Sequence, residues 1–192
     1  MIHNKDRSGW FGASDTHYIT GNWSTNTFAQ WWLIKLGLTR NVYENKYMFA
    51  GTHYEHKILD CIGVPEKDRQ VKIRKYRLRV NLDGSAQNCI YEVKTYKFSS
   101  VFSVSKAYWQ QAQIQMFVTG IKTLYIVAYG MLDEDYRNIF NSIDEKRISY
   151  HRIEYDPKFI SDVYLPRLLY LRRCMKYGVY PDWGEYCAIY HI

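Results

Sequence analysis

Two short segments near the middle of the chain carry residue types that could bind a cation and activate a water. They are Asn81-Leu82-Asp83-Gly84 and Tyr91-Glu92-Val93-Lys94-Thr95. If they are neighbouring strands of a β-hairpin, Glu92 and Lys94 point the same way, because side chains two residues apart share a face. Two interpretations are open: an ion pair on the surface, or a hard-cation site with a lysine beside a bound water. Spacing alone favours the ion pair, since Glu-x-Lys often occurs by chance.

The composition indicates one domain with a basic surface. The chain has 192 residues and no Pro- or Ser-rich stretch that would divide it, so residues 1–192 are expected to form a single domain. Its net charge of +7 suits a polyanionic partner without identifying one, because solvated faces alone can be this basic. Aromatic residues make up 17% of the chain and could stack on unpaired bases, although most are expected in the core.

Cysteine spacing and hydropathy argue against several classes of protein. The four cysteines form no C-x-x-C pair and have no histidine at zinc-finger spacing, which argues against structural zinc and iron–sulfur clusters. The N-terminal residues lack the apolar run of a signal peptide, and no segment has the roughly 18 consecutive apolar residues of a membrane span. We therefore expect a soluble cytoplasmic protein with reduced thiols and no membrane partner.

Hydrophobic periodicity predicts an α/β fold with a central mixed β-sheet flanked by α-helices. Helices are predicted over residues 28–38, 44–62 (which includes Glu55), 104–119 and 162–177, the last with Pro166 in its first turn. Strands are predicted over residues 71–80, around Asp83 and Glu92, over the apolar run 124–129 and, at an edge, over 148–153. The acidic residues 133–135 are expected in a solvated turn.

Four separated motifs follow one another in a specific order. They are Arg7…Gly12-Ala13-Ser14-Asp15, then Met48-Phe49-Ala50-Gly51-Thr52-His53-Tyr54-Glu55, then Asp83-Gly84 with Glu92-Val93-Lys94, then Tyr108-Trp109-Gln110-Gln111-Ala112-Gln113. This order resembles the YqaJ-like and phage lambda exonuclease branch of the PD-(D/E)xK nuclease superfamily. The resemblance spans residues 7 to about 130 and implies a restriction-endonuclease-like core. It departs from the superfamily's name at Leu82, which stands where the proline would be.

By this resemblance, three carboxylates and one main-chain carbonyl are expected to hold the metal. They are Glu55, Asp83, Glu92 and the carbonyl of Val93. Mg²⁺ bound there would make a water nucleophilic and neutralise the pentacoordinate phosphate in a two-metal hydrolysis, and Mn²⁺ is expected to substitute. Without cations, three converging carboxylates would repel one another.

The resemblance also assigns roles to a lysine and a glutamine. Lys94 would orient or deprotonate the attacking water and stabilise developing charge. Gln111 matches the glutamine on the helix behind the family's site, where it would hold the lysine or the water; a helix-surface amide is the alternative. His53 and His56 flank Glu55 but lack the i, i+4 spacing of a metalloprotease helix, so they are expected to be surface residues or to support the ligands.

Arg7 and Ser14 are similar to the pair that binds the terminal 5′-phosphate in lambda-type exonucleases. A guanidinium can contact a phosphate through two hydrogen bonds, and a serine at a helix start adds donors. The alternatives are an ordinary surface arginine and a helix N-cap serine. Met48 stands where such enzymes insert an apolar wedge between the terminal base pairs, although a core position on its helix is the favoured alternative.

Cationic residues are concentrated on the strand predicted over residues 71–80. They are Lys72, Arg74, Lys75, Arg77 and Arg79. This group could track a DNA backbone, and a solvated strand face explains it equally well.

Together these motifs imply a Mg²⁺-dependent exonuclease acting 5′ to 3′ on double-stranded DNA ends, in phage-type recombination or repair. The resemblance further implies a ring-shaped homo-oligomer, a single-strand annealing protein as partner, and the host cytoplasm as location if a phage encodes the chain. Two alternatives stay open: an endonuclease of the same fold, and a catalytically silent DNA-binding phage protein. The intact set of Glu55, Asp83, Glu92 and Lys94 argues against the silent protein, because burying converging charges costs desolvation energy.

Overall fold

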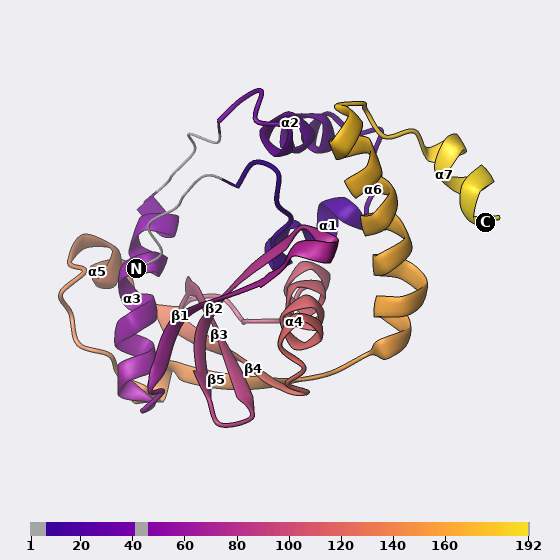
Figure 1. The fold of residues 1–192 in the computed structure, drawn as a ribbon. Coiled ribbons are helices and arrows are strands. Elements are labelled where there is room, and N and C mark those ends of the chain that lie inside the picture. Colours follow the sequence, from indigo (N-terminus) through magenta and orange to yellow (C-terminus); the bar gives the residue numbers. More distant parts are fainter. Residues whose placement is uncertain (1–6, 41–45, 192) are drawn as a thin grey trace.

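A five-stranded mixed sheet lies at the centre of the computed structural model, which describes residues 7–40 and 46–191 (Figure 1). In spatial order its strands are β1 (Glu66–Ile73), β2 (Leu78–Ala86), β3 (Cys89–Lys97), β4 (Thr123–Met131) and β5 (Ile148–Glu154). Strands β3 and β4 pair in parallel, and the other neighbours pair antiparallel. The sheet predicted from the sequence is confirmed, with β5 as the expected edge strand.

Helices connect and cover these strands. They are α1 (Thr16–Ile19), α2 (Asn26–Lys35), α3 (Lys46–Cys61), α4 (Lys106–Thr119), α5 (Asp133–Arg137), α6 (Leu165–Tyr177) and α7 (Trp183–Tyr190). Helix α4 makes the crossover between the two parallel strands. It begins where the Ser105 hydroxyl accepts the Tyr108 N–H and ends at Gly120, whose φ of +76° suits a glycine. The predicted helix over 44–62 corresponds to α3, and Glu44 lies outside the described residues.

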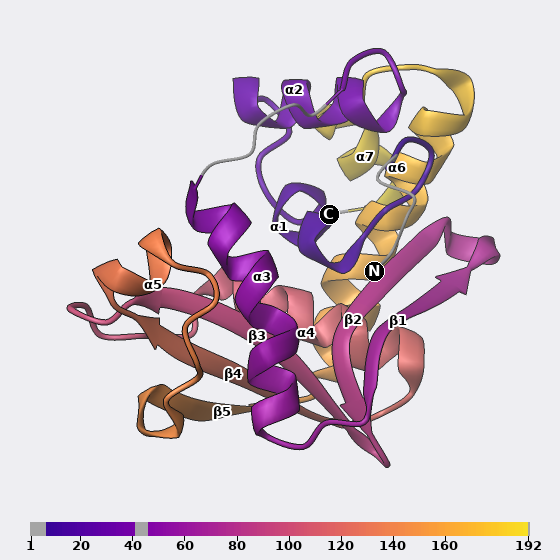
Figure 2. The same cartoon turned by 90° about the vertical axis from the view of Figure 1, so that its left-hand side faces the viewer.

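The two faces of the sheet carry two separate apolar cores. In Figure 2, α3 lies in front of the sheet and α4 behind it. On the α3 side, Ile58 and Leu59 pack with Val127 and Tyr129 of β4. On the other side, residues of α1, α2, α4, α6 and α7 form one core with Val80 of β2 and its neighbours. Strands β2, β3 and β4 are therefore held on both faces.

Residues 71–80 form a hairpin, whereas the sequence predicted one strand. Strand β1 ends at Ile73, a 3₁₀ turn follows over Arg74–Tyr76, and Arg77 adopts left-handed backbone with a φ of +56° before β2 begins. The cationic residues of this region are consequently spread over two strands and a turn, and do not form one strand face.

Residues 133–135 begin helix α5, so the prediction of a solvated turn is wrong. Asp135 is only 2% exposed, because its carboxylate accepts the Leu132 N–H at 2.8 Å and pairs with Arg147 at 2.5 Å. The last long helix also starts differently from the prediction. Its first turns, Phe159–Tyr164, are π-helical and lead into α6, which has Pro166 in its first turn as expected. Among the residues described, no helix is long and apolar enough to cross a membrane.

Candidate active site

Asp83 and Glu92 lie where strands β2 and β3 separate. The last paired residues there are Gly84 and Tyr91, so Asp83 and Glu92 come next in register but lie beyond the ladder. One oxygen of the Asp83 carboxylate accepts the main-chain N–H of Val93 at 2.9 Å instead. The opening between the two strands therefore carries two of the three carboxylates predicted to bind metal.

Glu92 is the centre of a buried hydrogen-bond network. Glu92 is only 3% exposed to solvent. Oε1 accepts from Lys94 Nζ and from Gln111 Nε2, both at 2.5 Å, and Oε2 accepts from Gln115 Nε2 at 2.5 Å. The Lys94 ammonium also lies 5.0 Å from the centre of the Tyr108 ring. The Glu92–Lys94 pair is thus largely buried, unlike the surface ion pair that Glu-x-Lys forms by chance.

Glycine at position 84 lets helix α3 approach strand β2. A Cβ atom there would lie 2.7 Å from Leu59 Cδ2 and 2.9 Å from Val64 Cγ1, closer than carbon atoms pack. Leu59 follows Glu55 by one helical turn, and residues four apart lie on one helix face. The Asp-Gly pair therefore combines a carboxylate with the space needed by the helix that carries Glu55.

The cluster holds more negative charge than Lys94 balances. Burial and the neighbouring Glu92 raise the pKa of Glu55 to about 7. Burial, Glu92 and Glu55 raise the pKa of Asp83 well above its usual range. Burial alone would lower the pKa of Lys94, but Glu92 and Asp83 stabilise its charge and the net pKa is raised. Carboxyl groups that retain protons because they crowd one another are ligands that a hard divalent cation can take over, so these residues fit such an ion.

One carboxylate beside Glu55 was not predicted from the sequence. Asp68 of β1 lies 3.1 Å from His56 Nε2, and the ligand atoms of Glu55, His56 and Asp68 all lie within 4.8 Å of one another. His53 is exposed, and its Nδ1 lies 2.8 Å from the Phe49 carbonyl of the same helix. Of the two histidines that flank Glu55, His56 is the one whose ring nitrogen lies close to other side chains that could ligate a metal ion.

The N-terminal loop brings Arg7 and Ser14 together. Arg7 Nη1 donates to Ser14 Oγ at 3.4 Å, and both residues are exposed. Ser14 lies inside the 3₁₀ turn Ala13–Asp15, whose N-cap is Gly12, so Ser14 is not the N-cap serine of the alternative interpretation. The hydroxyl and the guanidinium therefore lie next to each other at the surface.

A buried ion pair holds this loop against helix α2. Lys35, which is 2% exposed, pairs with Asp15 at 2.5 Å and donates to the Trp10 carbonyl at 2.9 Å. Asp15 also accepts the Trp31 indole N–H at 2.8 Å and the Gly12 N–H at 2.6 Å. These bonds attach the main chain on either side of Phe11 to α2, and they define the path of the loop between Arg7 and Ser14.

Known proteins resemble this chain in structure. No protein-family model matches it, and no curated protein does. Its fold is similar to that of the alkaline exonuclease LHK-Exo from Laribacter hongkongensis, with a TM-score of 0.64 and 18% identity over 90% of this chain and 92% of that one. The complex of LHK-Exo with dAMP gives a TM-score of 0.63 at 18% identity, with the same coverage of 90% and 92%. A phage-related exonuclease from Haemophilus somnus 129PT gives 0.64 and 16% identity over 88% of this chain and 94% of that one.

The chain has the fold of these exonucleases. This result confirms the restriction-endonuclease-like core and agrees with the resemblance of the motifs to the YqaJ-like and lambda exonuclease branch.

Within this exonuclease fold, the remaining residues predicted to contact DNA are Met48 and the cationic residues between positions 72 and 79. They lie in two places. Met48, in the first turn of α3, is 50% exposed, so the favoured interpretation as a core residue is wrong. The start of β2 joins the N-terminal loop: the Phe11 N–H donates to the Arg77 carbonyl at 2.8 Å, and the Arg79 N–H donates to the Phe11 carbonyl at 2.9 Å. Part of the cationic hairpin is therefore attached to the loop that carries Arg7.

Helix α4 of the exonuclease fold contacts several elements through glutamines. Gln110 donates to the Thr20 hydroxyl at 2.8 Å, and Gln113 donates to the Glu154 carbonyl at 2.8 Å, so both point away from Glu92, as their helical faces predict. Gln111 is not the surface amide of the alternative, because it bonds to Glu92. Gln115 was missed, although it follows Gln111 by one turn and helical spacing places it on the same face.

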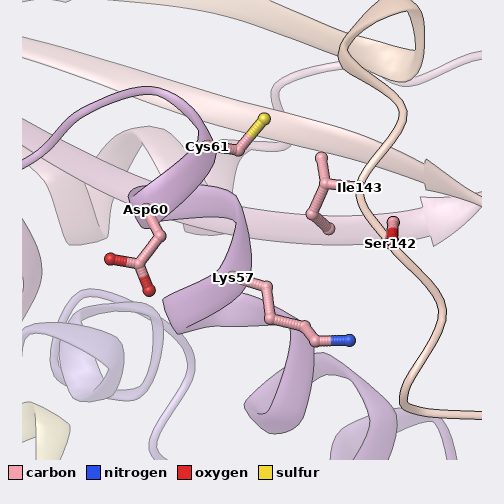
Figure 3. A pocket seen from close by; sticks show the side chains of 5 residues that line it. All are labelled: Lys57, Asp60, Cys61, Ser142 and Ile143. Atoms are coloured by element: carbon pink, nitrogen blue, oxygen red, sulfur yellow. The ribbon is translucent and has the colours of Figure 1, made fainter.

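A separate surface hollow of about 450 Å³ lies between the end of α3 and the loop before β5 (Figure 3). Lys57, Asp60, Cys61, Ser142 and Ile143 line it. The Lys57 ammonium donates to the carbonyls of Ile139 and Asn141, each at 2.7 Å, so it holds the loop in place. This hollow has no residue in common with the candidate active site.

Proposed function

We propose that this protein is a Mg²⁺-dependent deoxyribonuclease that degrades double-stranded DNA from its ends in the 5′-to-3′ direction. The observation that carries the proposal is the buried cluster in which Asp83 and Glu92 meet Lys94 at the opening between β2 and β3. The structural likeness to an alkaline exonuclease and a phage-related exonuclease supports the same class of activity.

Glu55, Asp83, Glu92 and the Val93 carbonyl would hold the divalent cations, and Mn²⁺ would be accepted in place of Mg²⁺. Two such ions, if bound there, would supply a nucleophilic water and would neutralise charge on the scissile phosphate. Glu55 and Asp83 have raised pKa values and must release their protons to bind a cation. Glu92 is held in one orientation by two amides, so its free lone pairs keep a defined direction.

Lys94 acts as a cation in this proposal. Its raised pKa keeps the ammonium protonated at neutral pH, so it donates hydrogen bonds to the water or to the phosphate oxygens and does not accept a proton. Gln111 donates to Glu92 Oε1, the oxygen that also accepts from Lys94, and so helps to hold the carboxylate with which the ammonium pairs. Lys94→Ala is expected to keep metal and DNA binding and to lose cleavage.

The preference for DNA ends rests on the N-terminal loop. Arg7 and Ser14 would bind the terminal 5′-phosphate, which a guanidinium and a hydroxyl recognise through charge-assisted hydrogen bonds. Met48 is exposed on α3 and is available as the wedge between terminal base pairs. LHK-Exo has been described with dAMP, and a mononucleotide is the product expected of an enzyme that shortens DNA from its ends.

The deciding experiment compares linear duplex DNA with closed circular DNA, in Mg²⁺ or EDTA. The linear DNA carries either 5′-phosphate or 5′-hydroxyl ends, and Lys94→Ala serves as the inactive control. Loss of linear DNA alone, faster with 5′-phosphate, is the expected result. Cut circles would favour the endonuclease, and absence of any cleavage would favour the silent DNA-binding protein.

The setting of the activity is a further part of the proposal. An enzyme that exposes single strands supplies the substrate of a single-strand annealing protein, which would be its partner in phage-type recombination or repair. A ring-shaped homo-oligomer would keep the enzyme on one DNA end. Size-exclusion chromatography with light scattering, with and without duplex DNA, measures the oligomeric state directly.

A further inference from the structure

A histidine and an aspartate stand beside the cluster predicted to bind Mg²⁺. Glu55, His56 and Asp68 offer one ligand atom each, and these atoms lie within 4.8 Å of one another. Two of these residues are consecutive on α3, and the third comes from β1, to which α3 leads through a short connection (Figure 2). An imidazole nitrogen is absent from the set formed by Asp83, Glu92 and the Val93 carbonyl.

The register of the sheet explains why Asp68 reaches this place. Lys67 pairs with Gly84 and Arg69 pairs with Leu82, so Asp68 lies across from Asp83. The pairing is interrupted at that step, and Asp68 has a φ of +57°. Carboxylates of three adjacent strands thus follow one another at one level of the sheet: Asp68 on β1, Asp83 on β2 and Glu92 on β3.

Glu55 connects the two groups. It interacts electrostatically with Glu92 on one side and with Asp68 on the other, and Asp83 in turn interacts with Glu55. A carboxylate can bridge two ions, and paired metal ions in phosphodiester hydrolysis lie about 3.5–4 Å apart.

We propose that Glu55, His56 and Asp68 form a second metal position with a nitrogen ligand, next to the all-oxygen position of Asp83, Glu92 and the Val93 carbonyl. This inference rests on the proposed function, and it specifies the chemistry of one of the two ions. Imidazole suits transition-metal ions such as Fe²⁺ and Zn²⁺, whereas Mg²⁺ prefers oxygen. The second position therefore selects a transition-metal ion, while the first accepts Mg²⁺.

The competing account is an ion pair that only ties α3 to β1. The contact of His56 Nε2 with Asp68 Oδ2 at 3.1 Å is compatible with it, and the two side chains are 44% and 25% exposed. The two accounts differ in whether added Mn²⁺ coordinates the His56 imidazole. If the three residues form a metal site, the ion bonds to the imidazole nitrogen. If His56 and Asp68 form only an ion pair, it does not.

Pulsed electron paramagnetic resonance of Mn²⁺ added to the full chain without DNA tests this difference. The expected result is nitrogen hyperfine coupling from one imidazole, which disappears in His56→Gln and persists in the matched control His53→Gln. Asp68→Asn is expected to weaken binding of that ion at least about tenfold in a Mn²⁺ titration. Asp83→Asn is expected to leave the nitrogen-coupled ion in place.

Two results would overturn the inference. They are the absence of nitrogen coupling in the wild-type chain, and coupling that survives in His56→Gln. Cleavage of linear DNA is measured on the same preparations. Cleavage without nitrogen coupling refutes this metal position alone, and nitrogen coupling without cleavage refutes the proposed nuclease while the metal position stands.

Discussion

Replacing Gly84 by alanine is expected to push helix α3 away from strand β2. The new Cβ would lie 2.7 Å from Leu59 Cδ2, whereas carbon atoms in contact lie about 3.5–4.0 Å apart, so the two must separate by about 1 Å. Overpacking of this kind costs about 1–3 kcal/mol, and the lower entropy of alanine in the unfolded chain returns about 0.4–1 kcal/mol. A net loss of about 1–2 kcal/mol lowers the melting temperature of a chain of this size by about 2–8 °C.

The same displacement should reduce activity by more than the loss of stability explains. Glu55 lies one turn before Leu59 on α3 and moves with it. Misplacing a group at an active site by about 1 Å can cost about 100-fold in rate. We expect Gly84→Ala to cleave linear duplex DNA about 10–100-fold more slowly at a temperature at which thermal unfolding monitored by circular dichroism shows it fully folded.

A double-mutant cycle with Leu59→Ala tests the cause. Leu59→Ala alone should cost about 2–5 kcal/mol, because the side chain is fully buried. It also removes the two Leu59 methyl groups that the new Cβ meets and leaves Val64 Cγ1 as its remaining close neighbour, so the double variant should be more stable than the sum of the single effects predicts, by about 1 kcal/mol or more. Additivity within about 0.5 kcal/mol, or an unchanged melting temperature in Gly84→Ala, would refute the close-approach explanation.

Three further predictions concern charges. Lys94→Met should abolish cleavage while isothermal titration still detects Mg²⁺ binding; a variant that retains full activity would remove Lys94 from the mechanism. Lys35→Met leaves the Asp15 carboxylate buried without its cation and should cost about 3–5 kcal/mol in urea unfolding, whereas the exposed Lys97→Met should change stability by less than about 0.5 kcal/mol. Burial and Glu92 raise the pKa of Glu55 from 4.5 to about 7, so the metal-free folded chain retains a proton that the unfolded chain has lost. Its stability in EDTA should therefore fall as pH rises from about 4.5 to 7, less so in Glu55→Gln, and Mg²⁺ should oppose the fall; calorimetry showing the same slope in both proteins would contradict this.

The larger elements of the fold were predictable because their signals are local. The helix before β4 has a serine cap and a glycine stop, and β4 is an almost unbroken apolar run. The hairpin at residues 74–77 has no such signal, because Arg77 occupies the left-handed position that glycine or asparagine usually marks. The burial of Asp135 was equally hidden, since its partner Arg147 is brought to it by the tertiary fold.

The candidate site likewise contains residues that the sequence could predict and residues that it could not. The order of four motifs predicted that Glu55, Asp83, Glu92 and Lys94 would converge, and the structure brings them together. Gln115 was predictable in principle from its helical spacing to Gln111. Asp68 was not, because its place beside Asp83 depends on the β1–β2 register, which in turn depends on a hairpin without a sequence signal.

The two amides on Glu92 have a consequence for how the site attracts cations. A guanidinium or ammonium from α4 could hold the carboxylate equally well, but each would cancel one negative charge. Gln111 and Gln115 help to fix its direction without adding charge, so of the three side chains described as donating to Glu92 only Lys94 changes the electric potential at the site. Neutral donors are also indifferent to pH and little affected by salt, which keeps the geometry of the site constant under conditions that change its affinity for metal.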